Sequence, residues 1–447
     1  MDIPEQRRML ALFDHKRKMM LPKLKHMLRR LIRAAAVALA AAGLFTNAQA
    51  DDRVVVLTSY PEALTVKFER AFEAANPGMR VELLWRQSRD GLAYLREGGY
   101  REVDVYWTPS PGNFVQLRDE GRLAKLELDD PDLPGMVGGV PLGDPDDHFA
   151  AFELAGFGIA YHREAVQSLG LEPPRDWADL AVPAYAGKVQ LPTPARTGFA
   201  SSLIEAVLQA QGWERGWALL SAIAGNAQLG SVLADGPDPL SMGRIAARMS
   251  IDFFARNSGE AVSFVYPPKT AYSPAHVAIM AEAPHPEAAR RFVDFVLSPA
   301  GQDLLWHADV RRLPVRASSY EGHPGTTAKP FATDALAYDS VLTEKRRGLV
   351  AELFDAVLTA PHEALRDAWQ ALRAAERQGS NDAWVGEARR LLESVPVDAV
   401  GQADAELRTL FSSPDSTAER AALIAVWTDD ARKRIAQARE LLAQVQQ

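Results

Sequence analysis

The chain has 447 residues, of which 24% are charged and 47% are hydrophobic, and its formal net charge is −8. This composition is typical of globular proteins and leaves room for two or three domains. The sequence contains no cysteine, which excludes disulfides, thiolate zinc sites, iron–sulfur clusters, a cysteine nucleophile and a lipid anchor on cysteine.

The first 50 residues have the pattern of a secretory signal peptide. Basic residues at Arg29, Arg30 and Arg33 precede an apolar run over 34–45, and the segment ends on small residues at 47–50. This order predicts a cleaved signal peptide over 1–50. The apolar run is shorter than the ~20 residues of a membrane span, so an uncleaved anchor helix is the weaker alternative. The translation start stays open among Met1, Met20 and Met27.

The rest of the chain is acidic. Residues 1–50 hold 10 Lys and Arg against 3 Asp and Glu, which leaves a net charge of about −15 for residues 51–447. This charge favours solubility and disfavours nucleic-acid binding. We therefore expect a monomeric protein that is exported to the periplasm and does not bind nucleic acid.

Residues 51–147 alternate between strand and helix patterns. We predict strands over 53–58, 79–85 and 104–107. Three helices alternate with them: one contains Leu64, Phe68 and Phe72, one covers 92–97, and one covers 114–120. This alternation predicts a parallel sheet with right-handed crossovers. Ligands bind such sheets beyond the carboxyl ends of the strands, which makes 58–61, 85–89 and 107–112 the candidate ligand loops.

A second lobe is predicted over 148–274, after which the chain returns to the first lobe over 275–334. In the second lobe we expect a strand pair over 149–161, a short helix at 177–180, helices over 199–211 and 213–222, and strands over 188–191, 248–254 and 261–266. The returning segment is predicted to form a strand over 275–280 and an amphipathic helix over 286–298, with another helix starting at 299. Two lobes joined by crossing segments leave a cleft, where small-molecule sites are common.

Residues 335–447 are rich in Ala, Leu, Glu and Arg. They predict an all-helical extension, with helices near 340–358, 362–378, 382–394, 402–411 and 417–446. Ser416 and Glu419 are a candidate capping box for the last helix. A helical bundle packed on one lobe is our interpretation, and a surface that docks a partner is the alternative.

Three motifs resemble the type 2 periplasmic solute-binding proteins of the ferric-iron and organophosphate group. They are VVLTSYPE at 55–62, DVYW at 104–107 and FVDFVLSPAGQ at 292–302, of which the last is the most specific. The resemblance covers roughly 53–316, and the chain looks most like the phosphoglycerate-transport binding proteins. It implies an α/β fold with two lobes that close on a ligand.

The resemblance also implies partners and the absence of catalysis. An ABC permease and its ATPase are the expected partners, and no cofactor or metal is expected. A ligand sensor that docks on a membrane signalling receptor, such as a sensor kinase, is a third class, and the helical extension would suit it. No G-x-S-x-G, H-E-x-x-H, Walker or G-x-G-x-x-G motif is present, which argues against the common enzyme classes.

The best candidate for a ligand contact is the segment before the predicted helix at 199–211. Arg196, Thr197 and Gly198 lie there, where unpaired helix N–H groups attract phosphate or carboxylate. Arg196 can bind an anion through two hydrogen bonds, the Thr193 and Thr197 hydroxyls can donate, and Gly198 permits close backbone approach. The alternative is that Thr197 only caps the helix.

Further candidate ligand contacts come from the other loops. They are Thr58, Ser59, Tyr60, Arg86, Trp107, Thr108, Asp252 and Tyr266. Alternatively, Arg86 is a solvated surface residue, and Trp107 is a core residue. Together they predict a small anionic metabolite, such as a phosphoglycerate-like acid or a sugar phosphate.

Ferric iron is the alternative ligand. Iron-binding members of the resembled group hold the metal with adjacent tyrosines, because phenolate oxygens suit Fe(III). This chain has no Tyr-Tyr pair, and its corresponding region offers only Asp252, Phe253, Phe254 and Tyr266.

Overall fold

The computed structural model describes residues 53–231, 237–256, 258–332, 335–379, 383–412 and 417–445. The predicted signal peptide and the candidate cap Ser416 lie outside these ranges. Among the described residues, no helix has both the length and the apolar character that a membrane crossing requires.

The first lobe begins with the predicted alternation of strands and helices. Strands β1 (Arg53–Thr58), β2 (Arg80–Trp85) and β3 (Val105–Thr108) lie in the order β2-β1-β3, and β1 and β3 are parallel. They are separated by α2 (Glu62–Ala75) and α3 (Ser88–Arg96), and α4 (Pro111–Asp119) follows β3. Helix α3 begins four residues before the predicted start, because its first turn is polar and carries no apolar periodicity.

One long strand replaces the predicted strand pair over 149–161. Strand β6 (Ala150–His162) has 13 residues and is buried along almost its whole length. Its first half pairs with β11 (Tyr272–Ile279), and its second half pairs with β9 (Ala247–Ile251). The prediction of two strands was wrong because a strand buried on both faces has no alternation or polar turn that would mark a break. A single mixed sheet thus runs through both lobes.

The second lobe extends this sheet. Beyond β9 lie β7 (Val189–Pro192) and β8 (Ala227–Gly230), which is parallel to β7. Strand β10 (Val262–Val265) pairs with β6. The helices of this lobe are α5 (Arg163–Ser168), α6 (Ala200–Gln211), α7 (Trp213–Ala224) and α8 (Asp252–Arg256). The strand predicted over 248–254 ends at Ile251, because Asp252 begins α8.

The returning segment carries β11, α9 (Pro286–Leu297), α10 (Pro299–Asp303) and β12 (Leu313–Pro314), which pairs with β6. A small hairpin of β4 (Met136–Val137) and β5 (Val140–Pro141) precedes β6. Short 3₁₀ turns lie at Gly99–Arg101, Trp177–Ala181, Pro183–Tyr185, Leu304–Trp306, Ala317–Tyr320 and Gly401–Ala403.

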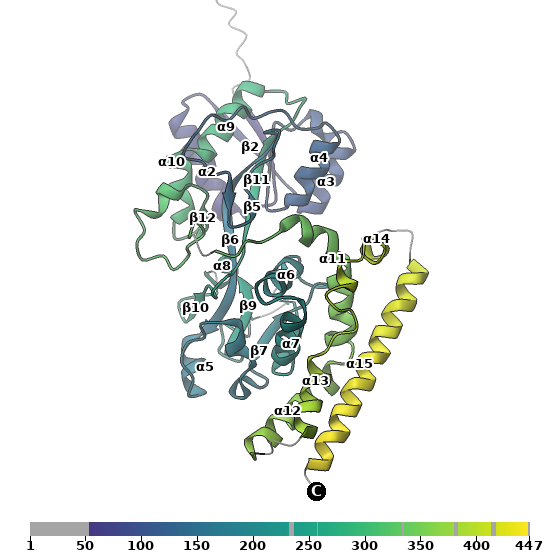
Figure 1. Ribbon diagram of the computed structural model, residues 1–447. Helices are drawn as coiled ribbons and strands as arrows, with labels where there is room; N and C mark the ends of the chain where they lie inside the picture. Colours follow the sequence, from purple (N-terminus) through teal and green to yellow (C-terminus); the bar gives the residue numbers. More distant parts are fainter. Residues whose placement is uncertain are drawn as a thin grey trace, which may run out of the picture. The chain divides into compact units, whose positions relative to one another are not determined.

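The extension is helical, as predicted (Figure 1). Its helices are α11 (Ser340–Phe354), which continues as a π-helical turn over Asp355–Thr359, then α12 (His362–Arg377), α13 (Ala383–Glu393), α14 (Ala405–Ser412) and α15 (Thr417–Val445). Helix α14 begins three residues later than predicted, since Gly401–Ala403 forms a separate 3₁₀ turn.

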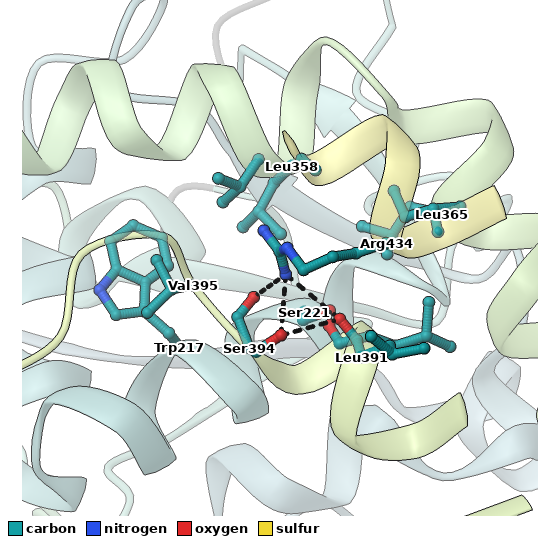
Figure 2. Close-up of a pocket in the computed structure, with 12 residues that line it drawn as sticks. Trp217, Ser221, Leu358, Leu365, Leu391, Ser394, Val395 and Arg434 are labelled. Carbon is teal, nitrogen blue, oxygen red and sulfur yellow. Dashed lines mark hydrogen bonds between the residues drawn. The ribbon is translucent and has the colours of Figure 1, made fainter. Parts of the chain in front are cut away.

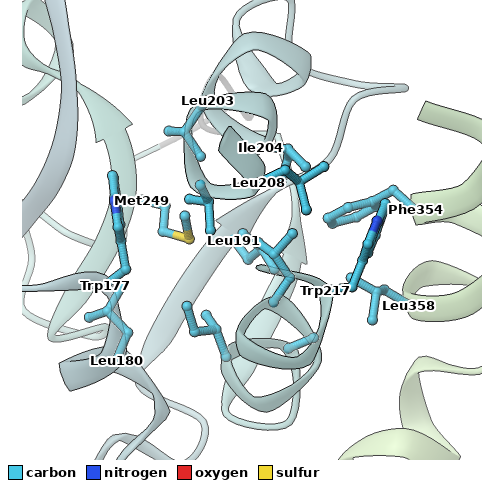
Figure 3. Packing of buried hydrophobic residues seen from close by; sticks show 14 of the residues in the cluster. Trp177, Leu180, Leu191, Leu203, Ile204, Leu208, Trp217, Met249, Phe354 and Leu358 are labelled. Atoms are coloured by element: carbon cyan, nitrogen blue, oxygen red, sulfur yellow. The ribbon is translucent and has the colours of Figure 1, made fainter. Parts of the chain in front are cut away.

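The extension and the second lobe share one hydrophobic core. Trp217 of α7 and Leu208 of α6 belong to the same buried cluster as Phe354 and Leu358 of the extension (Figure 3). The first lobe has its own clusters, such as the one around Phe68. The extension is therefore packed into the second lobe and is not a separate module.

Candidate functional site

Two chain segments cross between the lobes, and they meet at Gly156. One is β6, and the other is the stretch from Tyr266 to Tyr272. The rings of Tyr266 and Tyr272 stack with their centroids 5.8 Å apart. A β-carbon on Gly156 would lie 2.4 Å from the Tyr266 ring and 2.8 Å from the Tyr272 ring. The absence of a side chain at Gly156 thus allows the close approach of the two crossings.

Asp252 ties these two crossings together. Its Oδ2 accepts hydrogen bonds from the Gly156 backbone N–H at 3.0 Å and from the Tyr266 hydroxyl at 2.9 Å. Burial raises the pKa of Tyr266 well above its usual value, and the negative charge of Asp252 adds to the shift. Asp252 and Tyr266 were both predicted as ligand contacts. They hydrogen bond to each other where the two segments cross at Gly156, a region that we call the hinge.

The carboxyl ends of the parallel strands in both lobes point toward this crossing. In the first lobe, Thr108 at the end of β3 pairs with His276 of β11, and β11 begins at the crossing with Tyr272 paired to Gly156. In the second lobe, Ile251 at the end of β9 pairs with Phe157 of β6, and β7 is parallel to β9. The loops after β1, β3 and β7 thus lie on the hinge side of their lobes.

Three hydroxyl groups gather at these strand ends in the first lobe. The Ser59 Oγ lies 2.5 Å from Thr108 Oγ1 and 3.0 Å from Ser88 Oγ, and Ser88 Oγ lies 3.0 Å from Thr108 Oγ1. Thr108 is fully buried, whereas Ser59 and Ser88 are partly exposed. Ser88 was not singled out from the sequence, although the loop 85–89 was. It is the first residue of α3, whose capping position Gln87 makes no side-chain hydrogen bond.

Thr58, Tyr60 and Trp107 are placed in the interior of the first lobe. Thr58 Oγ1 accepts the Tyr60 backbone N–H at 3.1 Å, which closes the turn after β1. The Tyr60 ring lies 5.3 Å from the Trp107 ring, and Trp107 has no exposed surface. Of the two readings of Trp107, the structure places it in the core.

A buried carboxylate that the sequence did not reveal lies beside Tyr60. Glu153 of β6 accepts the Tyr60 hydroxyl at 2.8 Å and Arg312 Nη1 at 3.0 Å through the same oxygen, Oε1. Burial raises the pKa of Glu153, while Arg312 and the Tyr60 hydrogen bond oppose the shift. Burial and the neighbouring carboxylate also raise the pKa of Tyr60 well above its usual value, so the phenol stays protonated and donates. An acidic residue inside an apolar strand was the only signal.

In the second lobe, two buried threonine hydroxyls lie between β7 and α6. Thr193 is 2% exposed and Thr197 is 4% exposed, and neither Oγ1 has a hydrogen-bond partner among the described residues. The backbone N–H groups of Arg196 and Thr197 donate to Thr193 O at 3.1 and 3.0 Å, so the segment is a tight turn. The capping position of α6 is Phe199, without a side-chain cap. The N-cap alternative for Thr197 was therefore wrong.

The remaining predicted residues are exposed. Arg86 and Arg196 both reach solvent, and the Arg86 guanidinium lies 4.2 Å above the centre of the Tyr94 ring. A β-carbon added to Gly198 would meet nothing within 4 Å. The protein itself thus does not require glycine at position 198.

Two cavities elsewhere contain none of the predicted site residues. One of about 20 Å³ lies between α7 and the extension, where Arg434 donates to Ser394 and Leu391 (Figure 2). Its volume suits about one water molecule. The other, of about 400 Å³, lies beside α9 and is lined partly by Asp130 and Arg316, which form an ion pair. Within the described ranges, no cluster of three or more His, Cys, Asp or Glu side chains suits a metal ion.

Comparisons with known proteins agree with this architecture. The family model of bacterial extracellular solute-binding proteins matches residues 114–332. The chain is 30% identical over 366 residues to the phosphoglycerate transport regulatory protein PgtC of Salmonella typhimurium, which covers 81% of this chain and 90% of that protein. The alignment is longer than the part of the chain before residue 335, so it includes part of the extension.

Solved structures show the same fold. The periplasmic binding protein AfuA from Actinobacillus pleuropneumoniae, with exogenous fructose-6-phosphate bound, matches with a TM-score of 0.51 at 18% identity over 68% of this chain and 97% of that one. A Bordetella ferric binding protein matches with a TM-score of 0.52 at 20% identity over 68% and 98% of the two chains. The chain therefore belongs to the bacterial extracellular solute-binding proteins, and it has the two-lobed type 2 fold of the non-enzymatic binding components of ABC transporters.

Proposed function

We propose that this protein captures a small phosphorylated or carboxylated metabolite between its lobes, in the periplasm, and delivers it to an ABC permease and its ATPase. The observation that carries the proposal is the pair of buried hydroxyls of Thr193 and Thr197 beside the start of α6, which have no hydrogen-bond partner among the described residues. A buried polar group without a partner costs free energy, so such groups are normally met by a ligand or water.

The chemistry around these hydroxyls favours an anion. Helix α6 has 12 residues, and its first N–H groups carry a partial positive charge without a side-chain cap. Hydroxyl donors and helix N–H groups together replace the water around a phosphate or carboxylate. Arg196, exposed next to Thr197, supplies a guanidinium that can close over the bound anion.

The first lobe provides the opposite wall. Ser59, Ser88 and Thr108 present three clustered hydroxyls at the carboxyl ends of β1 and β3, close to the start of α3. Such groups suit the hydroxyls or a second acidic group of a metabolite. Arg86 follows β2 and is exposed, with its guanidinium over the Tyr94 ring, and it would have to leave that ring to reach the ligand. We assign Asp252 and Tyr266 to the hinge instead, because Asp252 Oδ2 accepts hydrogen bonds from the Gly156 N–H and the Tyr266 hydroxyl on the two crossing segments. Asp252 Oδ1 is buried and has no partner among the described residues.

The similar proteins point in the same direction. The relative at 30% identity is named for phosphoglycerate transport, and one structural neighbour holds fructose-6-phosphate. Other neighbours are ferric binding proteins, but the phenols near this hinge suit iron poorly. Tyr60 and Tyr266 donate to buried carboxylates, and their pKa values are raised by burial, which disfavours phenolate.

Presentation of the ligand to a membrane signalling receptor is a second candidate role. The relative is named as a regulatory protein of phosphoglycerate transport, and its alignment includes part of the extension. Both roles use the same ligand site. They differ in which membrane protein recognises the ligand-bound form.

A thermal-shift panel of phosphorylated metabolites, carboxylates and Fe(III) tests the proposal. A ligand that binds the folded state at 100 times its Kd stabilises it by about 2.7 kcal/mol, so 3-phosphoglycerate or a sugar phosphate should raise Tm visibly. We expect Thr193→Val with Thr197→Val to weaken the bound anion at least tenfold, because the donors are lost while the volume is kept.

Thr409→Val is the matched control, since its hydroxyl donates to Ala405 O within α14 of the extension. This variant should keep the affinity of the wild type. A rise in Tm with Fe(III) alone would contradict the proposal, and so would full anion affinity in the double threonine variant.

A further inference from the structure

Helix α6 is held by the first helix of the extension through a buried ion pair. Glu205 of α6 is 1% exposed and Arg346 of α11 is 4% exposed. Arg346 Nε lies 2.9 Å from both carboxylate oxygens of Glu205, and Nη2 donates to Oε1 as well. The pair joins two helices that are 141 positions apart in the sequence.

The surroundings fix Arg346 in this place. Its Nη1 donates to Gln402 Oε1 at 2.8 Å, and its guanidinium lies 5.1 Å from the centre of the Trp213 ring. On the α6 side, Gln209 donates to Glu205 Oε1 at 2.9 Å and also to Asp339 O at 3.1 Å. The extension therefore bonds to α6 at two residues, Glu205 and Gln209.

Glu205 has an electrostatic consequence for the start of α6. It lies five positions after Ala200, a distance of roughly 8 Å along the helix at ~1.5 Å per residue. A buried carboxylate at that distance opposes an anion at the helix N-terminus, and the opposition is strong because little water screens it. Arg346 supplies the compensating positive charge.

We propose that Arg346 is a positioning residue of the anion site, through which the extension neutralises Glu205 and sets the affinity of α6 for its ligand. The inference rests on the proposed function. It gives the extension an effect on ligand affinity that acts through α6. By thermodynamic linkage, a partner that displaces α11 from α6 would lower the affinity for the ligand. A bound ligand would in turn stabilise the contact between α11 and α6.

The sign of the effect separates this role from a purely structural one. With 3-phosphoglycerate and inorganic phosphate as probes, isothermal titration calorimetry of the full-length mature protein compares Arg346→Met, Arg346→Lys, Glu205→Gln and the double variant Glu205→Gln with Arg346→Met. We expect Arg346→Met to weaken binding about fivefold to tenfold. Arg346→Lys should stay within about twofold of the wild type, because it keeps the charge. Glu205→Gln should bind the anion more tightly, although it loses stability.

The double variant should return to near the wild-type affinity, because both charges are gone. Arg389→Met is the control, since Arg389 pairs with Glu376 and Glu393 inside the extension, away from α6. Affinity that simply follows Tm, with Glu205→Gln weakened like Arg346→Met, would overturn the inference while leaving the proposed function intact. If neither probe binds the wild type, the proposed function fails, and the inference fails with it.

Discussion

Gly156 sits where β6 passes from one lobe to the other, and its missing side chain determines how closely the second crossing can approach. The rings of Tyr266 and Tyr272 occupy the space that a β-carbon would need. The neighbouring carboxylate of Asp252 then bonds to both crossings. At the scale of single residues, the hinge is thus built from one glycine, two tyrosines and one aspartate.

Gly156→Ala should therefore destabilise the protein. We expect the free energy of unfolding to fall by about 1–3 kcal/mol, because the methyl group overpacks the crossing. Urea denaturation followed by fluorescence measures this change.

Gly198→Ala is the matched control, since nothing lies within 4 Å of the added atom. Its stability should stay within about 0.5 kcal/mol of the wild type. Equal stabilities of the two variants would show that the crossing accommodates the added methyl group. A loss of ligand affinity in Gly198→Ala alone would support close approach of the ligand to that backbone.

His276 gives the protein a pH dependence. It is 3% exposed and lies beside the rings of Phe114 and Phe149, and burial lowers its pKa to about 3 from a usual value of 6.5. Between these two values the unfolded chain binds one more proton at this residue than the folded chain. Its contribution to stability is therefore complete above about pH 6.5 and is lost as the pH falls toward 3.

His276→Phe should remove this slope. We expect the wild type to lose about 1.4 kcal/mol more per pH unit than the variant between pH 6 and 4. Urea midpoints at a series of pH values provide the comparison. Parallel curves for the two proteins would show that His276 is reached by water in the folded state.

At the scale of elements, the extension completes the second lobe. Trp369 of α12 donates to Ser221 Oγ at 3.1 Å, and its ring fills the place where a side chain on Gly225 would lie. Arg373 donates to Ala222 O at 2.9 Å, so it satisfies a carbonyl near the end of α7. Helix α12 thus both packs on α7 and caps it.

Trp369→Ala should cost about 3–5 kcal/mol of stability, because it opens a large cavity between α12 and α7. Trp384→Ala in α13 is the control, since that ring is 49% exposed, and it should change stability little. Thermal and urea denaturation of both variants provide the test. A small loss of stability in Trp369→Ala would mean that the packing of α12 on α7 contributes little to the stability of the protein.

At the scale of the whole molecule, the sheet passes through both lobes by way of β6, and the chain crosses a second time before β11. The carboxyl ends of the parallel strands in each lobe point to the crossing. This topology brings Thr108 and Ser59 of the first lobe and Thr197 of the second, which lie far apart in the sequence, to the ends of their lobes that face the hinge.

Local patterns in the sequence were sufficient for most elements. The apolar spacing of Leu64, Phe68 and Phe72 predicted α2, and the five helices of the extension followed from composition and periodicity alone. These signals are local because helix and strand faces repeat every few residues. The loop 85–89 and the threonines near α6 were proposed as ligand contacts from their positions at strand and helix ends, and they stay predictions.

Long-range contacts decided the rest. Only the folded chain shows that Trp107 is core, that Asp252 and Tyr266 bond to the crossings, and that Ser88 joins Ser59. The pairing of Glu205 with Arg346 across 141 positions also has no local signal. The sequence by itself therefore determined the elements, the family resemblance and the candidate loops. The tertiary structure decided which polar atoms of the described residues have hydrogen-bond partners and which do not, because a hydrogen bond between distant residues depends on packing that no short pattern encodes.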